Sequence, residues 1–218
     1  SNPQVELHIT GYGVITLELD ADKAPKSTEN FLAYVNKGHY NNTIFHRVIK
    51  NFMIQGGDPL SKDPARAAEY GSGGLNQLRA ESKAEKASAG AVAAVLAPGL
   101  PDSGGSQFMI LASDQPGIEG QYTVFARVVD GLEIVQAISN VATDATGVPA
   151  SRVEIRSITI RDTPVDPFEH PTAADLAAYR AIIETTLGNI EIGVLPDKAP
   201  ETVRSFLQWA AAGLFDGI

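Results

Sequence analysis

The sequence predicts a mainly β domain in which short antiparallel strands form a barrel capped by two helices. Three observations carry this prediction: apolar residues alternate along residues 14–20, they flank a tight turn within residues 45–58, and they recur at helical spacing after Pro25. Short strands joined by turns favour antiparallel pairing, because parallel strands need long crossover connections. A C-terminal segment, residues 172–218, is predicted to add two strands and a helix.

The first predicted elements are a hairpin and a helix. Residues 14–20 alternate as a half-buried strand does, and residues 5–9 are its expected antiparallel partner. Pro25 suits the first turn of a helix, where its missing N–H costs no hydrogen bond. The helix is expected to end near Gly38. Its buried stripe, at the spacing i, i+3, i+4 and i+7, consists of Thr28, Phe31, Leu32 and Val35.

The central stretch, residues 45–58, reads FHRVIKNFMIQGGD and predicts two short strands around a turn at Lys50-Asn51. Successive side chains of a strand point to opposite faces, and Arg47 and Gln55 lie an even number of positions apart. A regular pairing would therefore place both polar side chains on one surface. The Gly56-Gly57 pair permits a sharp turn or the close approach of another backbone.

The remaining elements follow in order. Residues 59–89 are polar and are expected to form a long surface excursion with a turn at residues 71–74. Further strands are predicted at residues 91–96, 107–111, 122–129 and 153–160, and a second helix around residues 132–138. In the last strand the apolar phase slips between Ile155 and Ile158, which predicts a β-bulge.

The central stretch resembles the signature of the cyclophilins, which are peptidyl-prolyl isomerases, and residues 105–110 (GSQFMI) resemble the family's GSQFFI. The resemblance implies a closed eight-stranded antiparallel barrel over residues 4–161 and isomerisation of X-Pro bonds in client proteins, with no cofactor and no metal. It gives three parts: an isomerase domain (residues 1–161), a Pro-rich linker (162–171) and a partial second repeat (172–218).

The resemblance also implies the site residues. Arg47 matches the arginine that contacts the carbonyl and ring-nitrogen side of the bound proline, Phe52 an apolar wall, and Gln55 a hydrogen-bonding neighbour; these three are the implied catalytic residues. The implied substrate-binding residues are Met53, Ala97, Gly99, Gln107, Met109, Ile118 and Tyr122.

Several positions depart from the family pattern. Met109 replaces a phenylalanine at the pocket floor, and Pro98 replaces a residue that offers a backbone N–H. Gly117 stands where many members have a tryptophan that contacts cyclosporin, and Tyr122 occupies a position that is often histidine. The departures at Met109, Pro98 and Gly117 motivate an alternative function: a chaperone or assembly module that binds proline-containing segments with little turnover.

The residue types suit isomerisation for a physical reason. Rotation about a prolyl bond crosses a barrier of about 18–20 kcal/mol, because amide resonance must be broken. A site needs an apolar cup for the ring and a donor for the lone pair that the nitrogen regains as the bond twists. The guanidinium of Arg47 would supply such donors without titrating.

Residues 172–218 repeat the start of the first domain. Residues 197–200 (DKAP) reproduce residues 22–25 at a shift of 175, and residues 188–194 echo residues 13–19. The helical stripe recurs as Val203, Phe206, Leu207 and Ala210. The repeat has no counterpart of Phe45 or of any catalytic residue.

So small a unit buries too little apolar area to stand alone. Three outcomes stay open: docking on its own first domain, pairing with the same segment of another chain, or exchange with residues 5–40 of a neighbour. Uncovered strand edges favour the second outcome, which makes residues 172–218 a predicted self-association element.

Charge and composition limit the partners. A net charge of −9 disfavours nucleic acid or an anionic membrane, since either needs a basic footprint. The sequence has no cysteine, which excludes disulfides and thiolate metal sites. The cyclophilin resemblance implies that the partners are proline-containing segments of client proteins. Residues 40–47 and 149–153 resemble exported bacterial cyclophilins, which favours the periplasm over the cytoplasm.

Two other features of the sequence could indicate a different chemistry. Residues 102–105 (DSGG) resemble the nucleophile motif of chymotrypsin-like proteases, but a match of four residues is weak support for a Ser-His-Asp triad. His46 is expected to be a hydrogen-bonded structural residue rather than a metal ligand or a base.

Overall fold

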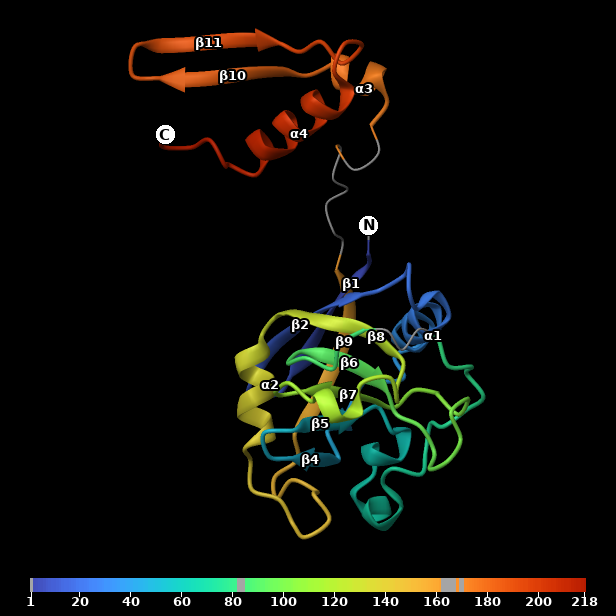
Figure 1. Ribbon diagram of the computed structural model, residues 1–218. Coiled ribbons are helices and arrows are strands. Elements are labelled where there is room, and N and C mark those ends of the chain that lie inside the picture. The colour runs from blue at the N-terminus through green and yellow to red at the C-terminus, as the bar shows by residue number, and fades with distance from the viewer. Residues whose placement is uncertain (1, 82–84, 162–167, 169–170) are drawn as a thin grey trace. The chain divides into compact units, whose positions relative to one another are not determined.

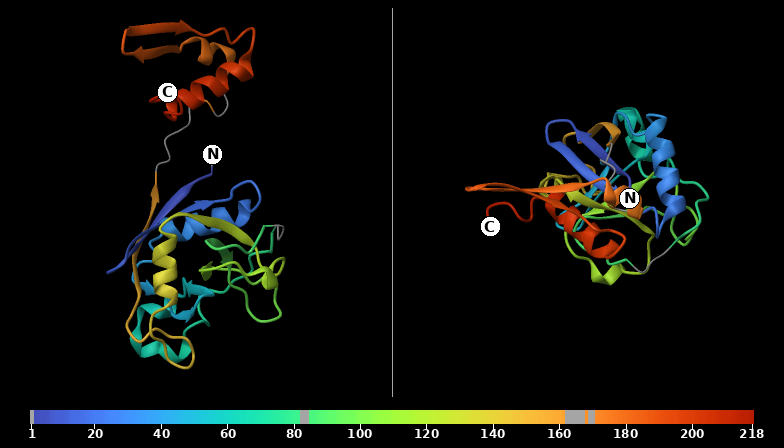
Figure 2. Two further views of the ribbon diagram at one scale, coloured as in Figure 1. Left: turned by 60° about the vertical axis from the view of Figure 1, so that its left-hand side comes forward. Right: turned by 90° about the horizontal axis from the view of Figure 1, so that it is seen from above.

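The computed structural model describes residues 2–81, 85–161, 168 and 171–218. These residues fall into two compact units, one within residues 2–163 and the other within residues 164–218 (Figures 1 and 2). Each unit has its own cluster of buried apolar side chains. No helix in the described part of the chain is both long and apolar enough to cross a membrane.

The first unit is a nine-stranded antiparallel sheet with two α-helices, so the predicted mainly β class is confirmed. The strands follow one another in the order β3-β9-β1-β2-β8-β6-β7-β5-β4. They are β1 (Gln4–Ile9), β2 (Gly13–Leu19), β3 (Thr43–Ile44), β4 (Arg47–Ile49), β5 (Met53–Gly56), β6 (Ala91–Ala94), β7 (Phe108–Leu111), β8 (Val124–Asp130) and β9 (Glu154–Arg161). The helices, α1 (Pro25–Asn36) and α2 (Leu132–Ser139), lie on opposite sides of the strands (Figures 1 and 2).

The sheet is open in its hydrogen bonding, so the predicted closed eight-stranded barrel is not confirmed. Within the described chain its two edge strands, β3 and β4, do not pair with each other. They are consecutive in sequence, however, with only Phe45 and His46 between them. The sheet must therefore curl until its edges meet. The chain itself joins those edges, and the fully buried Phe45 side chain anchors the junction in the core.

The core lies inside the curl. A row of directly opposed residues crosses five strands and belongs entirely to the main apolar cluster: Val48, Ile54, Ile110, Val92 and Ala126. Helix α1 covers one end, where the Phe31 ring contacts the rings of Tyr40, Phe108 and Phe125. The register of β1 against β9 shifts between His8 and Ile9, which confirms the bulge predicted near residue 156.

Helix α1 begins at Pro25 as predicted, but a residue distant in sequence caps it. The N-cap residue, Ala24, has no side-chain oxygen. The Glu81 carboxylate, from the surface excursion, accepts hydrogen bonds from the Lys26 N–H at 2.9 Å and the Ser27 N–H at 2.7 Å. A carboxylate at this end also interacts favourably with the helix dipole. The excursion therefore stabilises the first unit.

The substitution Glu81→Ala is expected to lower the free energy of unfolding by about 1–2 kcal/mol, because the first-turn N–H groups lose their cap. Urea unfolding measures the change. Glu29→Ala is the matched control, since among the described residues the Glu29 carboxylate on the same helix makes only an exposed ion pair with Lys26, at 3.8 Å. Equal losses in the two variants would contradict the capping role.

In its described residues the second unit contains two strands and two helices: α3 (Ala173–Ala177), β10 (Arg180–Thr185), β11 (Gly188–Gly193) and α4 (Pro200–Ala211). Strands β10 and β11 form an antiparallel sheet of two. The unit's small buried cluster consists of Phe168, Leu176, Val203 and Leu207. Residues 162–167 and 169–170, most of the predicted linker, lie outside the described residues.

Candidate active site

A row of directly paired residues crosses five strands on the outer face of the sheet. The row consists of Arg47, Gln55, Met109, Ala93 and Val124. Opposed residues of an antiparallel pair project to the same side. Arg47 and Gln55 therefore share one surface, as the sequence predicts, and the neighbouring row faces the core.

A second apolar cluster lies along this outer row. It brings together five of the residues that the sequence assigns to the proline pocket: Phe52, Met53, Met109, Ile118 and Tyr122. Met53 and Met109 are buried, whereas the other three are only partly buried. The structure thus places a partly open apolar surface beside Arg47 and Gln55, with the flexible Met109 side chain at its base.

A hydrogen-bonded chain of amides fixes Gln55. Its Nε2 donates to Gln107 Oε1 at 3.0 Å, and Gln107 Nε2 donates to the carbonyls of Gly71 at 2.9 Å and Gly73 at 2.6 Å. Gln107 is almost fully buried, so it orients Gln55 from beneath rather than contacting a ligand directly. The turn predicted at residues 71–74 thereby helps to position the site, which the sequence does not indicate.

Asp58 holds that turn in place. Its carboxylate is fully buried and accepts hydrogen bonds from the N–H groups of Leu60 at 2.8 Å, Gly71 at 2.5 Å and Gly73 at 3.3 Å. Just before it, Gly57 has φ +88°, and a Cβ there would lie 2.3 Å from the carbonyl oxygen of Ser106. The close backbone approach predicted for the glycine pair is confirmed.

Arg47 is the cationic side chain of the site, and it is open to a ligand. Its side chain is exposed and makes no hydrogen bond or ion pair with any residue that the structure describes. An arginine without an internal partner contributes little to folding and keeps all its donors for a ligand. The backbone of Arg47 is held in β4, which pairs with β5.

In the loop after β6, the backbone that is free to pair with a substrate peptide is that of Leu96, one residue before the expected Ala97. The Ala97 N–H donates to Ser103 Oγ at 2.7 Å, and the Ala97 carbonyl accepts from the Leu100 N–H at 3.0 Å. Gly99, with φ +74°, completes a tight turn and is exposed. Within the described chain, Leu96 makes no backbone hydrogen bond. Leu96 is therefore the better candidate for pairing with a peptide, and Gly99 remains a predicted contact at the rim.

His46 is structural, but it is not hydrogen-bonded as expected. It is 2% exposed, and neither ring nitrogen has a partner among the described residues. Burial lowers its pKa to about 4; the Asp58 charge opposes this shift, and the Arg47 charge adds to it. The ring packs edge-on against Tyr70. At neutral pH His46 is a neutral packing residue, not a base.

The lowered pKa predicts a pH-dependent stability. Because the unfolded chain binds a proton near pH 6.5 and the folded chain only near pH 4, the free energy of unfolding should fall by up to about 3 kcal/mol as pH falls through this window. Above pH 6.5 the contribution is complete. Urea unfolding of His46→Phe at several pH values should show a shallower fall, and equal slopes in both proteins would contradict this.

The protease-like motif has no triad. The Ser103 hydroxyl donates to the Leu100 carbonyl at 2.6 Å and accepts from the Ala97 N–H, so it is used within its own loop. Asp102 accepts from the Ala80 N–H instead of orienting a histidine. Among the described residues, no group of three or more His, Asp or Glu side chains is placed to hold a metal ion.

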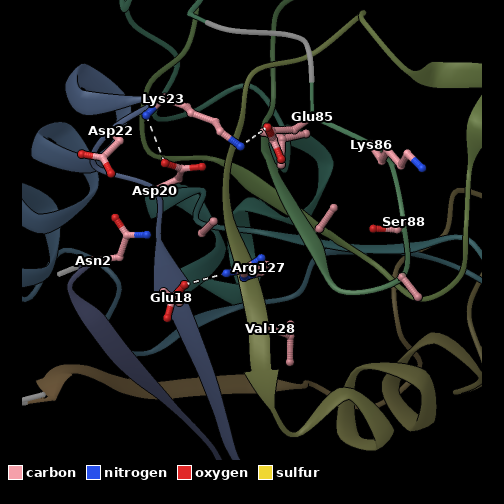
Figure 3. A pocket seen from close by; sticks show the side chains of 14 residues that line it. Asn2, Glu18, Asp20, Asp22, Lys23, Glu85, Lys86, Ser88, Arg127 and Val128 are labelled. Atoms are coloured by element: carbon pink, nitrogen blue, oxygen red, sulfur yellow. Dashed lines mark hydrogen bonds and ion pairs between the residues drawn. The ribbon is translucent and has the colours of Figure 1, made fainter. Parts of the chain in front are cut away.

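A separate cavity of about 610 Å³ lies over β2 and β8 and the segment around residue 86 (Figure 3). Two ion pairs line it, Glu18 with Arg127 at 2.9 Å and Lys23 with Glu85 at 2.6 Å. It contains none of the residues that the sequence assigns to the site. Its floor shares only Val124 and Ala91 with the apolar cluster described above, so it borders the site without belonging to it.

Comparisons with known proteins show which family model and which proteins this chain resembles. Residues 4–160 match the family model "Cyclophilin type peptidyl-prolyl cis-trans isomerase/CLD". The chain is 36% identical over 155 residues to the Arabidopsis thaliana peptidyl-prolyl cis-trans isomerase CYP18-2, which covers 71% of this chain and 92% of that protein. It is 38% identical over 153 residues to the mouse peptidyl-prolyl cis-trans isomerase-like 1, covering 70% and 89%.

Solved structures give the same result. The crystal structure of the Cryptosporidium parvum cyclophilin type peptidyl-prolyl cis-trans isomerase cgd2_1660 superposes with a TM-score of 0.65 at 31% identity, over 75% of this chain and all of that one. A second structure of that protein, in the presence of the dipeptide Ala-Pro, gives a TM-score of 0.64 at 32% identity, over 73% and 99%.

Proposed function

The chain belongs to the cyclophilin-type peptidyl-prolyl cis-trans isomerases, and we propose that it isomerises X-Pro bonds of client proteins on the outer face of β4, β5 and β7. One observation carries this assignment. Arg47, whose guanidinium has no partner among the described residues, pairs across the strands with Gln55, whose side chain Gln107 holds, beside an apolar cluster that contains Phe52 and Met109. Apolar walls and a free cationic donor are the two features that a prolyl bond requires.

The proposed mechanism assigns one task to each part. The apolar cluster removes the proline ring from water and holds it while the preceding peptide unit turns. As the bond twists, resonance is lost and the nitrogen becomes pyramidal with a lone pair. An N–H group of Arg47 donates to that lone pair, an interaction that exists only in the twisted state. Binding that is stronger in the transition state than in the ground state is what raises the rate.

Gln55 and Leu96 position the substrate. Gln55 Nε2 is held by Gln107, which leaves its Oε1 without a hydrogen bond to any described residue and available to a peptide N–H. The unpaired backbone of Leu96 would add one strand-like contact to the residues beside the proline. Such contacts fix one side of the bond so that the other side rotates.

A binding module with little turnover is the second candidate function. Two observations favour it. Met109 stands at the pocket floor in place of the family's phenylalanine, and the turn at Pro98 is closed by a hydrogen bond from the Leu100 N–H to the Ala97 carbonyl. Both features weaken recognition of the proline segment without altering Arg47. A protease-coupled assay on a short peptide with an Ala-Pro bond decides between the two. We expect the cis-to-trans rate to rise in proportion to protein concentration. Binding of the same peptide without any rate increase would support the module instead.

Cyclosporin should bind weakly, and Gly117→Trp should bind it at least about tenfold more tightly. The indole would restore an N–H donor and a large apolar surface. The site has room for it, because a Cβ at Gly117 has no heavy atom within 4 Å. Inhibition of the isomerase reaction measures the change, with Glu119→Trp in the same loop as the control. Tight binding by the unmodified chain would contradict this prediction.

Residues 172–218 are proposed to be a partial second cyclophilin-like repeat, supported by the DKAP copy at residues 197–200 and by the hairpin and helix on either side of it. We also propose that this segment mediates self-association through its uncovered strand edges, and that the chain is a bacterial protein of the periplasm, because residues 40–47 and 149–153 resemble exported bacterial cyclophilins. The relatives compared above come from a plant, a mouse and Cryptosporidium parvum.

A further inference from the structure

A tight loop, residues 142–150, follows helix α2 and the turn after it. Within this loop Thr143 pairs with Pro149 in an antiparallel bridge. Closer to the tip, the Asp144 N–H donates to the Val148 carbonyl at 2.9 Å. These two cross-links hold the 142–150 loop in one shape, although most of its residues are exposed.

The 142–150 loop packs against the strand that carries Arg47. Strand β4 lies at the edge of the sheet, and its Val48 N–H donates to the Gly147 carbonyl at 2.8 Å. A Cβ built on Gly147 would lie 3.4 Å from Arg47 Cγ and 3.2 Å from the Val48 carbonyl oxygen. The backbone of Gly147 therefore lies directly against the aliphatic stem of Arg47, and a side chain at position 147 would have to displace that stem.

Asp144 holds Gly147 in this position. Its Oδ1 accepts hydrogen bonds from the Thr146 N–H at 2.8 Å, the Thr146 hydroxyl at 2.7 Å and the Val148 N–H at 3.1 Å. These bonds lower the pKa of the Asp144 carboxyl, with the largest effect from the Thr146 hydroxyl. The Gly147 N–H donates to the Asp144 carbonyl at 3.1 Å, and Gly147 has φ +88°, a conformation that glycine adopts without strain.

Packing is the constraint that the structure places on the Arg47 side chain. The guanidinium is exposed and has no hydrogen bond or ion pair with any residue that the structure describes. A long side chain without contacts samples many rotamers, and ordering it when a ligand binds costs conformational entropy. A fixed backbone against the stem removes part of that cost in advance and leaves the donors of the guanidinium free.

We propose that the 142–150 loop is a positioning element for catalysis. Asp144 fixes the turn, Gly147 packs against the stem of Arg47, and the guanidinium is thereby directed toward the nitrogen of the twisting prolyl bond. Asp144 and Gly147 act through Arg47 and are positioning residues, not catalytic ones. The inference rests on the proposed isomerase function, which gives Arg47 its task. A misdirected guanidinium loses an interaction that forms only in the transition state, so the loop should affect kcat more than KM.

Asp144→Ala should lower kcat about three- to tenfold and change KM less than about twofold, the range expected when one long side chain loses its order. Asp144→Asn keeps an oxygen that can accept from Thr146 and Val148, and it should retain at least about half of the original kcat. Asp63→Ala is the matched control, because Asp63 is exposed and accepts the Ala65 N–H at 2.9 Å in another loop. This control should leave kcat unchanged, and an unchanged kcat in Asp144→Ala would overturn the proposal.

A pair of glycine variants tests the packing contact. Gly147→Ala places a methyl group against Arg47 Cγ and should lower kcat at least about tenfold. Gly11→Ala introduces alanine at a similar backbone angle, φ +78°, where a Cβ has no heavy atom within 4 Å. Both substitutions strain a left-handed glycine, so the comparison separates backbone strain from contact with Arg47. Equal losses of kcat in the two variants would overturn the proposal.

The double variant Arg47→Ala/Asp144→Ala shows whether the loop acts through the arginine. Two residues that act through one interaction are not additive, so Asp144→Ala should change the rate less than about 1.5-fold once Arg47 is absent. A further loss of about three- to tenfold in this background would mean that the loop supports turnover by another route. That result would also overturn the proposal.

The order of the Arg47 side chain can be measured without any turnover. In the free full chain, ¹⁵N relaxation of the Arg47 Nε–Hε group should give a lower order parameter in Asp144→Ala than in the unmodified chain or in Asp63→Ala. An unchanged order parameter would overturn the positioning role, even in a chain that isomerises prolyl bonds. A lowered order parameter in a chain without turnover would remove the proposed isomerase function and leave the contact between the loop and Arg47 supported.

Discussion

Replacing Arg47 with alanine is expected to lower kcat/KM by about 30- to 150-fold, which corresponds to about 2–3 kcal/mol of lost transition-state stabilisation. The fold should be unaffected, because the guanidinium is exposed and has no partner among the described residues. The loss should appear mainly in kcat, since the interaction with the twisted nitrogen forms only in the transition state. The protease-coupled assay measures the rate, and circular dichroism checks the fold.

Two further variants make the result specific. Arg127→Ala removes the same charge from an exposed site paired with Glu18 and should leave turnover unchanged. Arg47→Lys keeps the charge but loses the planar fork of donors, so it should recover only part of the activity. A folded Arg47→Ala protein with undiminished turnover would show that the assigned mechanism is wrong.

Asp58→Asn is expected to give the largest loss of stability, about 3 kcal/mol, although the substitution barely changes side-chain volume. The carboxylate is fully buried and serves three backbone donors, and hydrogen bonds to a charged group contribute about 1.5–3 kcal/mol each without being additive. An amide would turn one of its own donors toward those N–H groups. Urea unfolding measures the loss.

The same substitution should lower turnover in the fraction that stays folded. Gly71 and Gly73 lose their anchor, their carbonyls release Gln107, and Gln55 loses its fixed orientation. Asp63→Asn is the matched control, because Asp63 accepts one backbone N–H in the same excursion but is exposed. It should cost less than about 1 kcal/mol and leave the rate unchanged. Similar losses in both variants would refute the role of Asp58.

The elements of the first unit were predictable because their signals are local. The Pro25 start of α1, the strand alternation in residues 14–20 and the phase slip before Ile158 depend only on neighbouring residues. The even spacing of Arg47 and Gln55 gave their common face for the same reason. The openness of the sheet was not predictable, since it depends on two short strands, β3 and β4, whose ends meet without pairing.

The support of the site was not predictable because it is made by contacts between distant segments. Asp58 reaches Gly71 and Gly73 across the excursion, and no spacing rule connects an acid to two later glycines. The free backbone of Leu96 was missed for a related reason: the turn at Gly99 and the Ser103 hydroxyl decide which residues of that loop are already paired.

The junction at Phe45 and His46 has a consequence for motion as well as for form. Arg47 is the first residue after the junction, on a three-residue strand whose only ladder partner is β5. Short edge elements open at a lower free energy than the core they border. A transient parting of the two sheet edges would therefore displace the arginine while most of the sheet stays intact. Arg47 is therefore correctly placed only while the edges of the sheet at β3 and β4 stay together. On heating, we expect isomerase activity to be lost at a lower temperature than that at which the protein unfolds.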